Sequence, residues 1–191
     1  MNLTEAADEV IRITNRPDKR PEVIFQLNRA ISFFTLKAEF SRDLVESSLA
    51  ITPTLYGQTV SLSALTRFRK FKYIRPLGQR FYLTPIDATQ VFTPKGQIQP
   101  NRYFVGGSSL TVTLSNLDSS LEIGYFTYAP TLTEAAPDNT HWMLDMIPYA
   151  VIEKAAAKIF QIIGDEASLR TYEGSAMELF LTARRDFELQ T

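Results

Sequence analysis

The stretch PYAVIEKAAAKIFQIIGDEASLRTYEGSAMELFLTARRDF, residues 148–187, decides the helical part of the fold, because it predicts two long helices joined by a tight turn. Its apolar residues return every three or four positions, which is the spacing of one face of an α-helix. Gly164 is a typical helix end, and Asp165 can cap the start of the next helix. The two apolar faces consist of Ile152, Ala155, Ala156, Ile159, Phe160 and Ile163, and of Leu169, Tyr172, Ala176, Leu179, Phe180, Ala183 and Phe187.

Further helices are predicted on both sides of the middle of the chain. Residues 3–13 form a short amphipathic helix, and a helix carrying Trp142 precedes Pro148, which kinks or restarts it. Pro21 suits the first turn of a long helix that we expect over residues 21–48. This helix has two apolar stripes, so the second stripe either meets a neighbouring subunit or marks a central helix in a monomer. The stripes are Ile24, Leu27, Ile31, Phe34 and Ala38, and Phe33, Leu36, Phe40 and Leu44.

The pattern changes to a β-rich one between residues 51 and 132, where proline, glycine, threonine and serine become common. Apolar residues alternate over 110–114 and again over 121–125, which predicts a hairpin at about residues 109–128. Gly106 and Gly107 indicate a turn. Other strands are expected near residues 55–62, 72–75, 79–83 and 102–105, and residues 84–91 could form one helical turn.

The predicted fold class is therefore α+β: a bundle of about four helices, two N-terminal and two C-terminal, with a central β-rich insert. We place the helical bundle domain at residues 1–50 and 133–191 and the insert at residues 51–132. The 191 residues, 45% of them hydrophobic, are enough to form a hydrophobic core that needs no disulfide or metal site for stability. Zero cysteines exclude disulfides and thiolate metal sites. A net charge of -1 disfavours a nucleic-acid binder overall, and no targeting or membrane segment is expected.

The search for catalytic residues is mostly negative. We therefore expect that the protein is not an enzyme and that it binds no cofactor and no metal ion. His141 is the single histidine, and a packed side chain is the favoured interpretation. Glu39, Asp43 and Glu46 would share one face of the predicted long helix, a spacing that could position carboxylates for glycoside hydrolysis. Glu39 or Glu46 with Asp145 would be the first suspects for that activity, but a solvated or interface face explains them better.

A basic segment at residues 67–80 interleaves cations with aromatic side chains and contains no acidic residue. Such a segment can be a solvated strand, meet an acidic protein partner or hold nucleic-acid backbone and bases. We favour the first two alternatives over the third. Its cations are Arg67, Arg69, Lys70, Lys72, Arg75 and Arg80.

Several blocks together resemble the head-to-tail adaptor proteins (neck, connector or tail accessory proteins) of short-tailed bacteriophages. ITNRPDKRPEVIFQLNRAI (13–31) and EFSRDLVE (39–46) are similar to the family's long helix and its aromatic-x-Arg-Asp-Leu end. Arg67 to Lys70 matches a basic segment after the family's first strand. GQIQPNRYFVGGSSLTVTL (96–114) and LEIGYFTYAP (121–130) resemble its Pro-x-x-Tyr strand, glycine turn and closing strand. THWMLDMIPYAVIEKAAAKIFQIIGDEASLRTYE (140–173) resembles its C-terminal helices.

The resemblance implies a virion structural protein that assembles in the host cytoplasm and forms a ring, expected to have twelve subunits. Such a ring joins the portal protein to the tail nozzle or tail fibres and lines the channel through which double-stranded DNA leaves. The C-terminal segment is a common portal-docking element in this family; here it consists of Phe187, Glu188, Leu189, Gln190 and Thr191. The basic segment at residues 67–80 would face another protein. The alternative is a nucleic-acid-binding or glycan-hydrolysing phage accessory protein.

Overall fold

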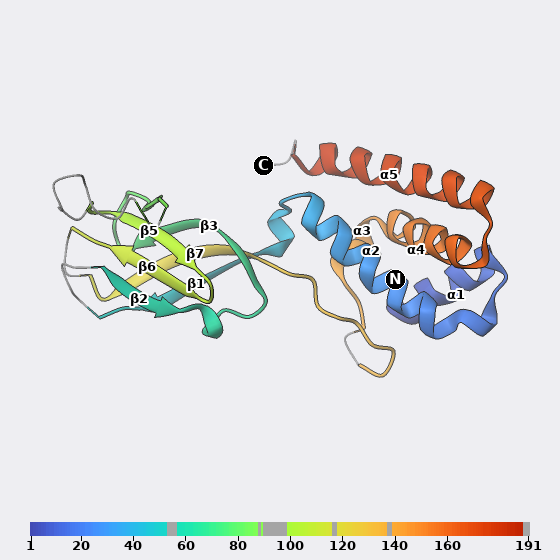
Figure 1. Cartoon of the computed structure of the whole chain (residues 1–191), viewed down its shortest axis with the longest axis horizontal. Helices are drawn as coiled ribbons and strands as arrows, with labels where there is room; N and C mark the ends of the chain where they lie inside the picture. Colours follow the sequence, from blue (N-terminus) through green and yellow to red (C-terminus); the bar gives the residue numbers. More distant parts are fainter. Residues whose placement is uncertain (53–56, 88, 90–98, 116–117, 137–138, 189–191) are drawn as a thin grey trace. The chain divides into compact units, whose positions relative to one another are not determined.

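The fold is mixed α+β, with five α-helices and two β-sheets among the residues that the structure describes (Figure 1). The computed structural model describes residues 1–52, 57–87, 89, 99–115, 118–136 and 139–188. Two compact units divide the chain: a helical unit made of Met1–Arg42 and Tyr128–Thr191, and a β unit made of Asp43–Thr127. None of the described helices combines the length and the apolar character that crossing a membrane requires.

The first two helices of the helical unit begin at clear local signals. α1 (Leu3–Thr14) starts with a capping box, in which the Glu5 amide donates to the side chain of Asn2 at 2.9 Å. The Asn2 amide donates back to the Glu5 carboxylate at 3.0 Å, so two otherwise unpaired donors are satisfied. α2 (Arg20–Lys37) carries Pro21 in its first turn, as the sequence predicts.

The three C-terminal helices follow the signals that the sequence offers. α3 (Trp142–Met146) is a short helix of five residues, and the next helix, α4 (Pro148–Ile163), begins at the proline. Gly164 ends α4 in the left-handed conformation, with φ 81°, which a residue with a side chain would adopt only under strain. α5 (Glu166–Glu188) starts where Asp165 accepts a hydrogen bond from a first-turn backbone amide at 3.0 Å. The predicted turn between the two long helices is confirmed.

Helix α4 is the centre of the helical unit, because it contacts each of the other four helices. Figure 1 shows it in orange, beneath α5. Its buried positions go all the way round the helix, and small side chains on them let the neighbouring helices approach closely. The buried alanines are Ala150, Ala155, Ala156 and Ala157.

A buried lysine interrupts the apolar surface of α4. Lys154 is 7% exposed and forms an ion pair with Glu173 of α5. Its ammonium also lies 4.5 Å from the ring centroid of Phe33 on α2, in cation–π contact. The lysine lowers the pKa of the Glu173 carboxyl, chiefly through their hydrogen bond. One charged side chain therefore connects three helices.

The β unit contains two sheets that pack on one shared hydrophobic core. The first is a three-stranded antiparallel sheet in the order β1 (Leu44–Ala50), β7 (Ser120–Thr127), β3 (Phe68–Pro76). The second has the order β2 (Gln58–Ser61), β6 (Ser109–Thr113), β5 (Arg102–Gly106), β4 (Thr84–Pro85), with β4 parallel to β5. β1 and β3 are thus edge strands on either side of β7.

The chain enters and leaves the β unit on neighbouring strands. Leu44, near the start of the unit, lies opposite Phe126, near its end, in the antiparallel β1–β7 register. The predicted turn at Gly106 and Gly107 is confirmed: Gly107 has φ 58°, and Gly106 pairs with Ser109 across the β5–β6 hairpin.

A tyrosine crosses the first sheet above a glycine. Gly124 of β7 is paired with Tyr73 on one side and with Glu46 on the other. The Tyr73 ring covers the glycine, because a Cβ at Gly124 would lie under 3.0 Å from three ring carbons. The Tyr73 hydroxyl then donates to the Glu46 carboxylate at 2.6 Å. This bond is the main reason that the pKa of Tyr73 is raised to about 12.

The predicted helix over residues 21–48 is wrong in its second half. α2 ends at Lys37, Ala38 is extended, and residues 44–50 form strand β1 instead. As strand β1, these residues form backbone hydrogen bonds with β7, which they could not form as part of a longer helix. This pairing with a strand far along the chain overrides the local helix pattern. The boundaries between the units therefore fall after Arg42 and Thr127 rather than after residues 50 and 132.

The predicted hairpin at residues 109–128 is also wrong, although both of its strands exist. β6 pairs with β5 and β2, whereas β7 pairs with β1 and β3, so the two strands belong to different sheets. Alternation identifies a strand but not its partner. No strand occupies residues 79–83, and the expected helical turn at 84–91 begins as strand β4, with residues 88, 90 and 91 outside the described part.

Substitution of Gly124 by alanine should destabilise the β unit by about 1–3 kcal/mol, because the new methyl group collides with the Tyr73 ring. Hydrogen exchange of β7 amides during urea titration measures the loss. Gly106→Ala is the matched control, since its Cβ meets only an ordinary contact at 3.8 Å. Equal behaviour of the two variants would contradict the overlap between ring and glycine.

Alkaline titration should reveal the bond between Tyr73 and Glu46. The folded pKa of about 12 lies above the ordinary value near 10, so this stabilisation is complete below about pH 10 and is lost as the pH rises towards 12. Urea unfolding at several alkaline pH values measures the effect, and Tyr73→Phe should remove that part of the pH dependence. An unchanged profile in Tyr73→Phe would count against the bond.

Candidate functional site

Three aromatic rings join the C-terminal end of α5 to the rest of the helical unit; we call them the C-terminal aromatic cluster. Phe40 follows α2, Trp142 is the first residue of α3, and Phe187 lies in the last turn of α5. Phe40 meets Trp142 at 4.8 Å and Phe187 at 5.7 Å between ring centroids, and Trp142 meets Phe187 at 5.8 Å. All three contacts are edge-to-face, the geometry that aromatic quadrupoles favour.

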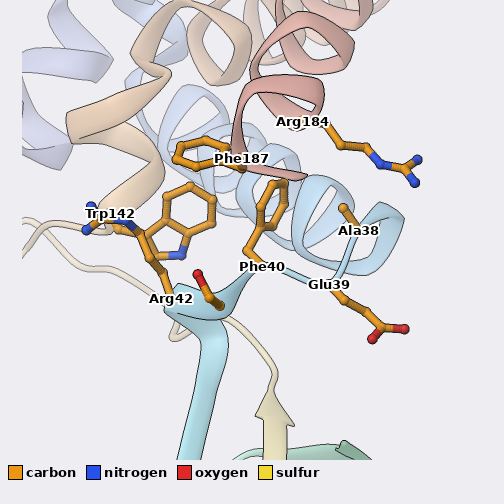
Figure 2. Close-up of a pocket in the computed structure, with 8 residues that line it drawn as sticks. Ala38, Glu39, Phe40, Arg42, Trp142, Arg184 and Phe187 are labelled. Atoms are coloured by element: carbon orange, nitrogen blue, oxygen red, sulfur yellow. The ribbon is translucent and has the colours of Figure 1, made fainter. Parts of the chain in front are cut away.

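A small cavity lies beside this cluster (Figure 2). Its volume is about 50 Å³, room for a few water molecules at most and far below the size of an ordinary ligand pocket. Figure 2 shows the carboxylate of Glu39 and the guanidinium of Arg184 extending away from the rings. The cavity is therefore a packing feature of the helix end and is too small to enclose a sugar or a nucleotide.

The expected portal-docking segment begins inside this cluster. Phe187 is partly buried by its own unit, so its ring is an internal anchor for α5. Glu188 is the last residue of α5, and residues 189–191 lie outside the described part of the chain. The docking role of these five residues stays a prediction, and any portal contact by Phe187 has to compete with its packing against Phe40 and Trp142.

Some cations of the basic segment have partners inside the β unit, and several, Lys70 among both, are exposed at its surface. Arg75 forms an ion pair with Glu122, and Arg69 and Lys70 lie 5.5 Å and 5.9 Å from the Phe126 ring. These cations help to hold β3 against β7. Exposed cations are spread along β3 and the residues that flank it: Arg67, Lys70, Lys72 and Arg80.

An open groove that the sequence did not predict lies between the start of α4 and the C-terminal half of α5. Its volume is about 550 Å³. Three of its apolar side chains are well exposed: Met146 at 49%, Tyr149 at 54% and Leu179 at 40%. Glu178 and Asp186 are exposed carboxylates in its lining. We call this feature the acidic groove.

The apolar stripe of the last helix predicts that Leu179 is buried together with Phe180. The structure buries Phe180, which stacks on Phe34 at 4.5 Å, and exposes Leu179. Adjacent residues on a helix are about 100° apart, so a stripe that contains both is wider than one contact face. That excess width was the available signal for the groove.

The structure separates the carboxylates that the sequence placed together. Glu39 follows α2, whereas Glu46 lies in β1 and accepts the Tyr73 hydroxyl, so the shared helix face is wrong. Asp43 lies in a short 3-10 turn before β1 and is buried. Asp145 accepts from the N-terminal ammonium at 2.9 Å. The spacing argument for a glycoside-hydrolysing pair therefore no longer holds.

His141 serves as the cap of α3. Its Nδ1 accepts a hydrogen bond from the Met143 amide at 3.3 Å, and the residue is 8% exposed. Such a cap satisfies a backbone donor at the helix start. Within the described ranges, no group of three histidine, aspartate or glutamate side chains is placed to hold a metal ion.

Two comparisons with known sequences give no match for this chain. A scan against protein-family models finds no match for the chain, and a search of curated proteins finds no significant match.

Replacement of Phe187 by alanine should destabilise the helical unit by about 1–3 kcal/mol, less than for a fully buried phenylalanine. Trp142, the single tryptophan, lies against the lost ring, so its fluorescence during urea unfolding reports the change. Leu181→Ala, at a position 53% exposed on the same helix, should change stability by less than about 0.5 kcal/mol. If both variants behave alike, Phe187 is no anchor.

Proposed function

We propose that the chain is a non-enzymatic structural subunit of a bacteriophage head-to-tail adaptor ring. In this proposal the helical unit is a bundle that forms the ring wall and binds the portal protein. The β unit is an insert between α2 and α3 that is available to the tail nozzle or tail fibres, and double-stranded DNA passes through the channel. The ordered sequence blocks that resemble this family motivate the assignment.

The observation that carries the proposal is the number of large apolar side chains left at the surface of the helical unit. Side chains that are at least half exposed occur on α2, α4 and α5, although the core of the unit is well filled: Phe25, Leu36, Tyr149, Ile162 and Leu181. Single exposed apolar residues are ordinary, but the acidic groove brings Tyr149 together with Met146 and Leu179, which are 49% and 40% exposed. In a ring, neighbouring subunits would bury such exposed apolar side chains at their interfaces.

The small cavity and the dispersed carboxylates give no support to the hydrolase alternative. Glu46 and Asp145 both accept hydrogen bonds from groups of the protein, and the cavity beside Glu39 holds about 50 Å³. A protein that acts by binding partners needs contact surfaces but no set of catalytic side chains. The exposed apolar residues of this chain therefore fit a binding role better than a hydrolase.

The proposal predicts a change of mass on mixing with the portal protein of the same bacteriophage. Native mass spectrometry of the chain alone and with the portal should show a ring, or a complex that saturates at a fixed subunit ratio. A chain that ends at Glu188 should keep the Trp142 fluorescence of the folded helical unit and bind the portal at least about tenfold more weakly.

The control for the shortened chain is a substitution on the other unit, Asp87→Ala, which should leave portal binding unchanged. A full-length chain that stays monomeric and does not bind the portal protein would contradict the proposal. Equal portal binding by the shortened and full-length chains would remove residues 189–191 from the docking site while leaving the ring intact.

A further inference from the structure

The two units carry opposite net charges. The helical unit has twelve lysines and arginines against sixteen carboxylates, a net charge of -4, whereas the β unit has eight against five, a net charge of +3. The whole chain, at -1, hides this separation. Two copies of such a chain attract each other when the helical unit of one approaches the β unit of the other.

The negative contact surface is the acidic groove. Its exposed apolar residues Met146, Tyr149 and Leu179 lie with the carboxylates Glu178 and Asp186. Within the part of the chain that the structure describes, neither carboxylate forms an ion pair. A groove of this kind fits a partner that offers cations beside apolar or aromatic side chains, and it repels a nucleic-acid backbone.

The β unit offers such a surface along strand β3. β3 is an edge strand, paired with β7 on one side. Lys72 of β3 is exposed, and so is Arg80 in the segment that follows it, where the large side chains of Leu77 and Tyr82 are 56% and 59% exposed. Cations on an edge strand prevent indiscriminate strand pairing, while they leave a specific contact through side chains open.

We propose that the acidic groove of one copy of this chain receives the β3 edge and the following turn, residues 67–82, of a second copy. The occupant is a second copy because the chain itself supplies both complementary surfaces. The contact is heterologous, so its repetition closes a ring if the rotation between copies allows it. The inference deepens the proposed function, and its ring rests on that function, but the pairwise contact can be tested without the portal.

Charge reversal tests the contact with a built-in rescue. Glu178→Lys with Asp186→Lys gives a groove-reversed chain, and Lys72→Glu with Arg80→Glu gives a strand-reversed chain. Each should self-associate about 10- to 100-fold more weakly than the original chain in sedimentation velocity at low salt. An equimolar mixture should recover association, because each reversed surface then meets an opposite charge on the other variant.

The matched control is Glu22→Lys with Glu166→Lys, which changes the net charge of the helical unit equally but lies outside the groove. It should self-associate more strongly than the groove-reversed chain. Association that the groove-reversed and strand-reversed variants leave unchanged, or no recovery in their mixture, would overturn the inference.

Cysteine cross-linking locates the contact, since the chain has no cysteine of its own. A mixture of Leu179→Cys and Tyr82→Cys should give several times more disulfide-linked heterodimer than Leu179→Cys mixed with Val45→Cys. Val45 is 38% exposed on β1, the opposite edge of the same sheet. Equal yields would overturn the proposed contact.

The outcomes separate this inference from the proposed function. Reversed variants that still saturate the portal at the original ratio, without loss of self-association, refute the β3 contact and leave the adaptor role standing. Cross-linked copies that ignore the portal refute the adaptor role and leave the contact standing. Salt-dependent binding of duplex DNA by Lys72 and Arg80, together with equal cross-linking yields, would assign the β3 edge to nucleic acid instead.

Discussion

The helical unit depends on the burial of α4 on all of its faces. A helix in this position needs small side chains wherever another helix crosses it, and Ala155, Ala156 and Ala157 supply them. Lys154 is tolerated at the same depth because Glu173 and the Phe33 ring compensate its charge. Each of α1, α2, α3 and α5 contacts this one helix.

The elements that the sequence predicts well are those with local causes. Gly164 and Asp165 mark the turn between α4 and α5 by backbone conformation and capping, which depend on residues nearby. The end of α2 depends on the pairing of β1 with β7, which is far along the chain, and β6 pairs with the distant strand β2 as well as with β5 across the adjacent turn. Periodicity carries no information about strand partners, which is why the predicted long helix over residues 21–48 and the predicted hairpin at residues 109–128 are wrong.

The candidate surfaces divide in the same way. The basic segment is visible in the sequence because its cations lie within fourteen consecutive residues, and the structure gathers most of them on one edge strand. The acidic groove is assembled from three helices, and its existence depends on which of Leu179 and Phe180 turns inward. That choice is made by the stacking of Phe180 on Phe34, a contact between distant parts of the chain.

The opposition of Leu44 and Phe126 in the β1–β7 ladder has an evolutionary consequence. Neighbouring strands are about 5 Å apart, so the chain enters and leaves the β unit through almost the same point. A segment held in this way can be lengthened, exchanged or lost by one genetic event without rerouting the helices on either side of it. Related chains can thus change what their β unit touches while the packing around α4 is inherited intact.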